Sequence, residues 1–335
     1  MGNRVVSGVR PTGRLHLGNY VGTLQNWVKL QNSEKYECYF FVADWHSLTT
    51  GYENPTQVGC NLLNVFMDLM AIGLDPEKVV LFLQSSIPGH SELFLIYSMI
   101  TPMGWLERNP TVKDMIRDYD MKEHVNYGLI GYPVLQAADI TLYKGNYVPI
   151  GKDQLPHLEL TREIVRRFNA FYGEVFPEPQ ELLTEFPVLK GLDGRRMSKT
   201  LGNTIPIICD KEELWQTVKN AVTDPARVYR SDPGHPEICN VFHYYSVFFQ
   251  NEIRDTDLEN NCRKGTIGCM DCKKQLCNSL FSMLQPFYEK KQDLMQKPVW
   301  VKELIMHSSL TAEKISSQTI QEVKNLFGFK AVCYE

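Results

Sequence analysis

The first two thirds of the chain alternates short apolar runs with amphipathic segments. Apolar runs rich in β-branched and aromatic residues predict buried strands at 4–9, 37–44, 79–83 and 148–150. Apolar positions spaced by three and four predict helices at 20–30, 55–73, 91–100, 126–142 and 155–171. We expect a kink or restart at Pro133, and we interpret the charged residues 105–125 as an irregular insertion. This order predicts an α/β fold with a parallel sheet and helices on both faces.

Strand patterns fade after about residue 206. From there the spacing predicts helices over 211–222, 274–289 and 313–326. A chain of 335 residues is long enough for two cores. We therefore expect a parallel-sheet domain over 1–205, with the insertion near 105–125, and a mostly helical domain over 206–335.

Composition changes this picture little. Hydrophobic residues make up 43% and charged residues 22%, as in ordinary globular proteins. The net charge of −4 gives no global basic field, so any RNA contact must use local patches. No apolar run approaches a membrane span, and the N-terminus has no signal-peptide core. We expect a cytoplasmic protein that does not contact a membrane.

The first segment with candidate chemistry follows the first strand. Arg10-Pro11-Thr12-Gly13-Arg14 forms a turn, and His16-Leu17-Gly18-Asn19 leads into a helix. A helix start offers free backbone N–H groups to anions such as phosphate. His16 can donate to a phosphate oxygen, Gly18 allows close approach, and Asn19 is a neutral partner. An ordinary strand-to-helix turn capped by Asn19 explains this segment alone about equally well.

The second segment is the polar, glycine-rich stretch that ends in Arg195-Arg196-Met197-Ser198-Lys199-Thr200. Three cations and two hydroxyls within six residues suit a mobile loop that closes on triphosphate. Taken alone, a solvated basic loop is the simpler interpretation. The two segments together favour a nucleotide site because each supplies what the other lacks.

In this order, the two segments resemble the nucleotide signatures of class I aminoacyl-tRNA synthetases. Longer matches narrow the resemblance to the tryptophanyl-tRNA synthetase family. The runs that carry it are Ser7-Gly8-Val9-Arg10-Pro11-Thr12-Gly13, Ala43-Asp44-Trp45-His46, YPVLQAADI at 132–140 and GKDQLPHLELTRE at 151–163. Three positions depart from the family pattern: Lys152 replaces an acid, Arg196 replaces the first Lys of the KMSKS loop, and Thr200 replaces its last Ser.

The resemblance implies a Rossmann-type catalytic domain, a C-terminal anticodon-binding domain and a homodimer. The implied reaction joins L-tryptophan to ATP, with Mg²⁺, and then to tRNA(Trp). His16, Lys199 and Arg196 would be catalytic. The implied ATP-binding residues are Arg10, Pro11, Thr12, Gly18, Asn19, Gly151, Lys152, Asp153, Val188, Arg196, Met197, Ser198, Lys199 and Thr200.

For tryptophan, the resemblance implies that Asp139 accepts the indole N–H. Its apolar neighbours Ala137, Ala138 and Ile140 argue against a surface carboxylate. Indole offers one donor and no acceptor, so an acceptor is the matching partner. The other implied substrate-binding residues are Tyr132 and Gln154 at the α-ammonium group, and Val6, Gln136 and His46 along the pocket wall. His46 could equally be a satisfied core histidine.

Four of the nine cysteines are spaced C-x22-C-x6-C-x2-C, at Cys239, Cys262, Cys269 and Cys272. Their last three members lie in a short, polar, glycine-containing stretch that we interpret as a loop. Without a secretory signal, thiols in such a stretch indicate a metal site more than disulfides. Spacing alone does not separate zinc from an iron–sulfur cluster, and free thiols are a third reading. The pattern resembles a bacterial subgroup of the family with a [4Fe–4S] cluster.

Three other readings stay open. A tyrosyl-tRNA synthetase shares the fold and the pattern of Tyr132, Gln136 and Asp139. A small adenylyltransferase would have a similar turn at His16 but no long helical C-terminal domain. A non-catalytic RNA-binding relative is expected to have lost His16 or Lys199, and both are present. A dehydrogenase is disfavoured because no G-x-G-x-x-G follows a strand.

Overall fold

The computed structural model describes residues 2–118, 125–183, 189–199 and 201–328. Its sheet has five parallel strands in the order β3-β2-β1-β4-β5. The strands are β1 (Arg4–Val9), β2 (Glu37–Val42), β3 (Val80–Leu83), β4 (Tyr147–Ile150) and β5 (Gln180–Leu183). The prediction of an α/β fold with a parallel sheet is confirmed. β5 was not predicted, because Gln-Glu-Leu-Leu has no β-branched residue.

The register aligns the carboxyl ends of the first three strands. Val9 lies opposite Val42, and Val42 lies opposite Leu83. The residues that follow these strands therefore emerge together at the carboxyl-terminal end of the sheet. Ligands of open parallel sheets bind at this end.

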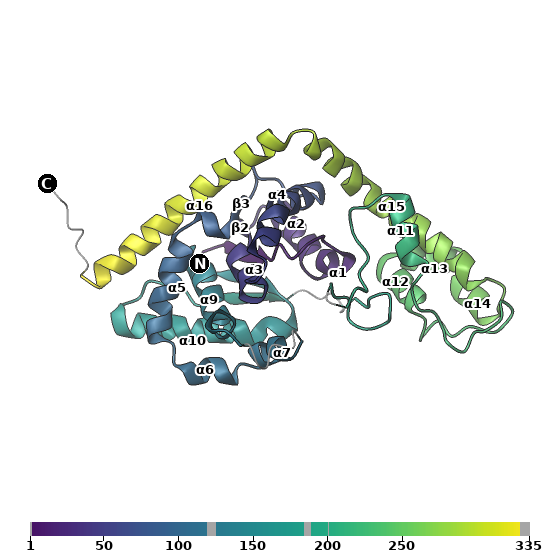
Figure 1. The fold of residues 1–335 in the computed structure, drawn as a ribbon, viewed down its shortest axis with the longest axis horizontal. Helices are drawn as coiled ribbons and strands as arrows, with labels where there is room; N and C mark the ends of the chain where they lie inside the picture. The colour runs from purple at the N-terminus through teal and green to yellow at the C-terminus, as the bar shows by residue number, and fades with distance from the viewer. Residues whose placement is uncertain (1, 119–124, 184–188, 200, 329–335) are drawn as a thin grey trace. The chain divides into compact units, whose positions relative to one another are not determined.

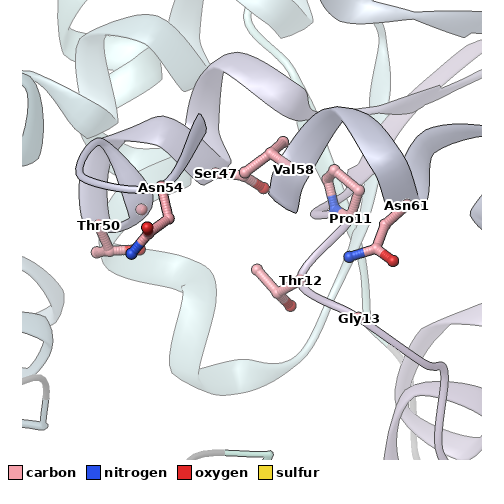
Figure 2. A pocket seen from close by; sticks show the side chains of 9 residues that line it. Pro11, Thr12, Gly13, Ser47, Thr50, Asn54, Val58 and Asn61 are labelled. Carbon is pink, nitrogen blue, oxygen red and sulfur yellow. The ribbon is translucent and has the colours of Figure 1, made fainter. Parts of the chain in front are cut away.

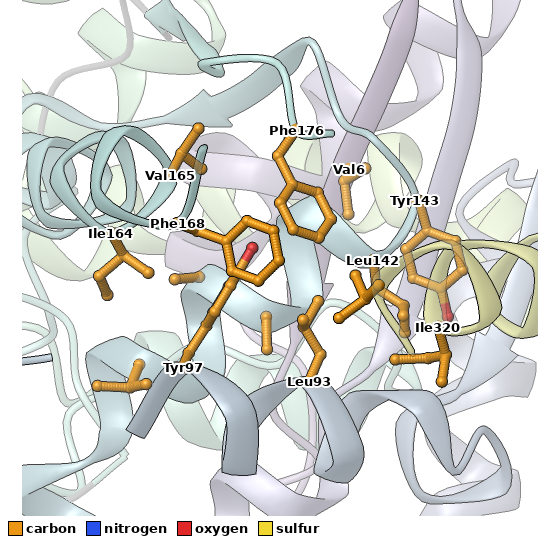
Figure 3. Packing of buried hydrophobic residues seen from close by; sticks show 14 of the residues in the cluster. Val6, Leu93, Tyr97, Leu142, Tyr143, Ile164, Val165, Phe168, Phe176 and Ile320 are labelled. Atoms are coloured by element: carbon orange, nitrogen blue, oxygen red, sulfur yellow. The ribbon is translucent and has the colours of Figure 1, made fainter. Parts of the chain in front are cut away.

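Helices bury both faces of the sheet, as predicted. On one face, Tyr39 and Phe41 of β2 join a core cluster with α5, α9, α10 and α16 (Figures 1 and 3). On the other face, Phe40 stacks on Trp27 of α2, with ring centroids 4.3 Å apart. Besides α6 and α7, which are described below, the helices around the sheet are α2 (Gln25–Asn32), α3 (Asp44–Gly51), α4 (Pro55–Ala71), α5 (Gly89–Ile100), α8 (Tyr127–Ile130), α9 (Tyr132–Leu142), α10 (Leu155–Tyr172) and α16 (Pro298–Leu326).

The prediction of an irregular segment over 105–125 is wrong for its described part. Residues Met103–Arg108 form α6, and Pro110–Asp118 form α7. Each helix starts next to a proline, which tolerates the first turn because it needs no N–H there. The restart predicted near Pro133 is confirmed, since α8 ends before Gly131 and α9 begins at Tyr132.

The C-terminal helix α16 covers the sheet at β3, the first strand in the sheet order. It runs along β3 and α5 (Figure 1) and is longer than the predicted 313–326. The backbone N–H of Leu81 in β3 donates to Ser308 Oγ of α16 at 2.7 Å. This bond satisfies a strand N–H that would otherwise lie open at the edge.

The structure divides into two compact units. Unit 1 comprises 1–13, 25–185 and 297–335, and it holds the sheet and α16. Unit 2 comprises 14–24 and 186–296. Its helices are α1 (Leu17–Asn19), the π-helix η1 (Tyr20–Leu24), α11 (Lys211–Val218), α12 (Asn240–Phe248), α13 (Gln250–Asp255), α14 (Leu258–Arg263) and α15 (Cys269–Met295). The chain thus passes between the units several times, whereas the sequence suggested a single boundary after residue 205.

Within the described residues, no helix combines the length and apolar character that crossing a membrane requires.

Candidate active site

A buried carboxylate lies at the centre of one cluster in unit 1. Asp139 of α9 is 1% exposed, among the buried residues Ala137, Ala138 and Ile140. Its Oδ2 lies 2.8 Å from His46 Nε2, and its Oδ1 lies 2.6 Å from His90 Nδ1. Gln84 Nε2 donates to both oxygens, at 2.8 and 3.0 Å. The interior location predicted for Asp139 is confirmed.

The surroundings of Asp139 favour its ionised form. Burial alone would raise the pKa of this carboxyl. The charge and hydrogen bond of His46, followed by those of His90, outweigh burial and lower the pKa of Asp139. An ionised carboxylate only accepts hydrogen bonds, so this group is suited to a ligand that donates.

Two partners of Asp139 were missed from the sequence. Gln84 directly follows β3, and His90 lies in the first turn of α5. His46 lies near the start of α3, just after β2. The aligned strand ends therefore bring these three side chains to one carboxylate. Their position after strands was the available signal, since polar residues there lie at the edge of the sheet where ligands bind.

Other predicted tryptophan-binding residues lie around His46. The Tyr132 ring meets the His46 ring edge-on, with centroids 4.4 Å apart. Among the described side chains, His46 Nδ1 and Gln136 Oε1 are buried polar atoms without a hydrogen-bond partner. Such atoms are uncommon in folded proteins and indicate an absent ligand or water. Val6 is fully buried in the core cluster.

A cavity of about 330 Å³ lies beside the turn after β1 (Figure 2). Pro11 and Thr12, both predicted to bind ATP, line it. Arg10 Nη2 donates to Thr50 Oγ1 at 2.5 Å, which ties this turn to α3. The rest of the lining comes from Gly13, Ser47, Thr50, Gly51, Asn54, Val58 and Asn61, all uncharged.

The predicted ATP residues after β4 lie in and next to a short 3-10 helix, η3 (Lys152–Gln154). Gly151 precedes this helix, Lys152 is exposed, and Gln154 is half-buried. The side chain of Asp153 and all of Val188 and Thr200 lie outside the described residues.

The first nucleotide signature, His16-Leu17-Gly18-Asn19, forms the N-terminal cap and first turn of helix α1 in unit 2. His16 Nδ1 accepts from the Asn19 N–H at 3.3 Å, and Asn19 Oδ1 accepts from the His16 N–H at 3.2 Å. This reciprocal pair is a capping box on α1. Because Nδ1 accepts, the proton of a neutral His16 is on Nε2. His16 can thus offer one N–H donor while it caps the helix.

The neutral form of His16 is also favoured electrostatically. Burial, followed by the charge of Lys199, lowers the pKa of His16 to about 4. The two signatures therefore come together within unit 2. A second contact joins them, since the Gly18 N–H donates to Met197 Sδ at 3.3 Å.

The second signature is held by a residue missed from the sequence. Asn203, 3% exposed, accepts from the Ser198 N–H at 2.8 Å and donates to the Arg196 carbonyl oxygen at 3.1 Å. It also donates to Asp193 Oδ1 at 2.7 Å. A Cβ at Gly191 would lie 2.3 Å from Asn203, so the backbone needs glycine there. A side-chain amide thus fixes the loop that was predicted to be mobile.

The four spaced cysteines gather in unit 2. Cys239 precedes α12, and Cys262 lies in α14; Cys269 and Cys272 open α15, so the loop expected over 262–272 is confined to 264–268 between the two helices. Burial, followed by the charges of Cys239, Cys262 and Cys269, raises the pKa of Cys272 to about 12.

An arginine faces two of these thiols. Arg227 Nη1 lies 3.7 Å from Cys269 Sγ and 4.0 Å from Cys262 Sγ. Across the described part of the chain, no three His, Cys, Asp or Glu side chains are arranged to hold a metal ion.

Comparisons with known proteins agree with this geometry. The family pattern described as tRNA synthetases class I (W and Y) matches residues 2–285. A tryptophan–tRNA ligase of Thermotoga maritima is 46% identical, covering 96% of this chain and 98% of the relative. One of Aquifex aeolicus is 40% identical, with the same two coverages. Among solved structures, tryptophanyl-tRNA synthetase of Campylobacter jejuni in complex with ADP and tryptophan superposes on this chain with a TM-score of 0.87. The two sequences are 34% identical, and the match covers 97% of this chain and 99% of the other.

These relatives span nearly the whole chain at identities well above those that indicate only a shared fold. With the buried acceptor at Asp139 and the paired signatures at His16 and Lys199, they decide between the readings left open by the sequence. The chain belongs to the tryptophanyl-tRNA synthetases, within the class I synthetases for tryptophan and tyrosine.

Proposed function

We propose that the chain activates L-tryptophan with magnesium-bound ATP and transfers it to tRNA(Trp), using Asp139 to select the amino acid. The observation that carries this assignment is the buried carboxylate of Asp139, kept ionised by histidines from two neighbouring segments. An indole ring presents a single donor, and this site presents an acceptor. A pocket that satisfies one specific hydrogen bond rejects analogues without it by about 10⁴-fold or more.

The chemistry requires positioning and charge stabilisation but no covalent enzyme intermediate. The tryptophan carboxylate attacks the α-phosphorus, and magnesium pyrophosphate leaves. Neutral His16 donates from Nε2 to a phosphate oxygen, because its Nδ1 accepts from Asn19. Lys199 and Arg196 supply positive charge to the triphosphate, and Asn203 holds the backbone between them. The terminal adenosine of tRNA then attacks the aminoacyl adenylate.

The ATP contacts are proposed for the residues that the family pattern matches. Arg10, Pro11 and Thr12 occupy the turn after β1, and Gly151, Lys152 and Asp153 follow β4. Tyr132 and Gln154 hold the α-ammonium group of tryptophan, and His46, Gln136 and Val6 line its pocket. The unpartnered atoms His46 Nδ1 and Gln136 Oε1 support a ligand beside them.

We also propose that Cys239, Cys262, Cys269 and Cys272 hold a [4Fe–4S] cluster, with Zn²⁺ as the alternative. The donor set fits, since four thiolates are the usual ligands of such clusters. A Cβ at Gly234 would lie 2.5 Å from Cys262 Sγ, so only glycine there lets this sulfur lie against the backbone. Arg227 would offset the negative charge of the bound group. Metal binding would displace protons from these thiols and draw them together.

Metal analysis tests this assignment without relying on enzyme activity. Anaerobically purified protein should be brown and contain about four irons per chain. Cys269→Ser should lose the colour and most of the iron, while Cys60→Ser, at an exposed thiol outside the group, should keep both. Stoichiometric zinc without iron would overturn the cluster in favour of the alternative.

A homodimer and the anticodon-binding role of residues 206–335 complete the proposal. Leu95 and Met99 on α5 are 56% and 73% exposed, and Met103 on α6 is 45% exposed. Large apolar side chains exposed in this way are typical of an interface between subunits. The sequence similarity extends through both units, which supports a tRNA-binding role outside the sheet.

Aminoacylation tests the function directly. The wild type should charge a tRNA(Trp) transcript with tryptophan, and Asp139→Asn should lower kcat/KM by 100-fold or more, on the order expected for a lost specific hydrogen bond. Asp224→Asn is the matched control, compared in ATP–pyrophosphate exchange because Asp224 lies in the part proposed to bind tRNA; it is also a buried carboxylate bonded to a histidine, His235, at 2.7 Å. Equal losses in both variants, or charging with tyrosine, would refute the assignment.

A further inference from the structure

The hydrogen-bond chain at Asp139 continues away from the proposed tryptophan pocket. His90 binds Asp139 Oδ1 through Nδ1, and its Nε2 lies 2.8 Å from Tyr143 Oη. His90 and Tyr143 are both 0% exposed. Tyr143 directly follows α9, and its ring lies against Tyr39 and Phe82 of the sheet. Figure 3 shows Tyr143 within the apolar core, so the chain of polar atoms ends in a fixed side chain.

The partners determine how each ring is bonded. Ionised Asp139 only accepts, so His90 donates from Nδ1 and His46 donates from Nε2. The Nε2 of His90 faces the Tyr143 hydroxyl, which can donate to a neutral ring or accept from a protonated one. His46 Nδ1 has no hydrogen-bond partner among the described groups.

Counting acceptor sites shows what the carboxylate can still bind. An ionised carboxylate offers about four lone-pair sites. Three donor atoms make four contacts with it here: His46 Nε2 and His90 Nδ1 reach one oxygen each, and Gln84 Nε2 reaches both. A further donor must therefore take over one of the two contacts that Gln84 now makes.

We propose that Tyr143 and His90 are positioning residues that fix the Asp139 carboxylate as the acceptor of the indole N–H, and so set the selectivity for an N–H-bearing ring. The inference rests on the proposed function, since it assumes that tryptophan binds at Asp139. The Tyr143 hydroxyl fixes the ring of His90, and His90 fixes the carboxylate. A carboxylate held in one position favours a donating ring, because a ring without an N–H forfeits a hydrogen bond to this charged acceptor.

The substitution Tyr143→Phe removes the hydroxyl and keeps the packed ring. The matched control is Tyr97→Phe, because Tyr97 is also 0% exposed and its hydroxyl bonds a side chain of α9, Thr141, at 2.8 Å. Tryptophan-dependent ATP–pyrophosphate exchange is measured for both variants. The second substrate is 3-benzothienylalanine, which has sulfur in place of the indole N–H.

In Tyr143→Phe, the KM for tryptophan should rise about five- to tenfold, as expected for a loosened hydrogen bond, while kcat changes less than about twofold. The KM for 3-benzothienylalanine should change little, so the preference for tryptophan falls by the same factor. Tyr97→Phe should keep the wild-type preference. His90→Asn retains a donor near the Nδ1 position, and it should keep more of the preference than His90→Leu.

An unchanged preference in folded Tyr143→Phe would overturn the inference. Equal losses for both substrates would also overturn it, because they would indicate a packing role. These results differ from a failure of the proposed function, in which the wild type would not use tryptophan or Asp139→Asn would exchange normally.

Discussion

The charge state of His16 follows from its burial and leads to a sharp prediction. Burial, followed by the positive charge of Lys199, lowers the pKa of this imidazole from 6.5 to about 4. At pH 5.5 an unperturbed histidine would be about 91% protonated, whereas one with a pKa of 4 is about 3% protonated. The shift of 2.5 pKa units corresponds to about 3 kcal/mol.

The sign of the effect on stability follows from this direction. The pKa of His16 is lower in the folded than in the unfolded chain, so protonation favours unfolding. The contribution of His16 to stability is constant above pH 6.5, and it falls by up to about 3 kcal/mol as the pH drops from 6.5 to 4. Neutral His16 also means that its Nε2–H donor is present across the neutral pH range.

NMR titration of the histidine ring protons measures this pKa. His16→Asn identifies the resonance by its loss, and asparagine keeps a good N-cap for α1. The His16 signal should titrate with a midpoint near 4, and the remaining seven of the eight histidines serve as internal references. A midpoint of 6 or above would refute both the burial argument and the proposed donor role at neutral pH.

Three further changes test other parts of the structure. Lys199→Ala should lower kcat of adenylate formation by about 100-fold or more and leave the KM for tryptophan nearly unchanged, because the charge of Lys199 is needed most in the transition state. A loss confined to tryptophan binding would contradict the role of Lys199 at the triphosphate. Ser308→Ala should lower the free energy of unfolding of unit 1 by about 1–3 kcal/mol in thermal unfolding, because the Leu81 N–H loses its acceptor. The control Ser309→Ala, which removes a half-buried hydroxyl, should lower it by less than about 0.5 kcal/mol. Met99→Glu should shift the light-scattering mass from that of the proposed dimer toward that of a monomer, and an unchanged mass would contradict an interface at Met99.

Much of the sheet, and the buried position of Asp139, could be predicted because the signals were local. The strands β1 to β4 are apolar runs, and Asp139 stands out as a charge inside an apolar helix. Gln84 and His90 could not be identified from local pattern. Only the register of β2 and β3 brings them to Asp139, and register is a tertiary property.

The errors have physical reasons as well. Residues 103–118 form helices because α6 follows Pro102 and α7 begins at Pro110, and because each helix packs one apolar face, as Leu106 and Val112 show by their burial. β5 is a weak strand by sequence and is stabilised by pairing with β4. The domain boundary expected near residue 205 stays a prediction.

ATP–pyrophosphate exchange with each of the twenty amino acids tests the central claim most directly, because it isolates amino-acid selection from tRNA binding. If the Asp139 pocket selects an indole N–H, exchange should require tryptophan, and tyrosine should be lower by about 10⁴-fold or more in kcat/KM. The same assay on Asp139→Asn should show the tryptophan signal largely lost. Comparable exchange with tyrosine, or none with tryptophan, would contradict the account.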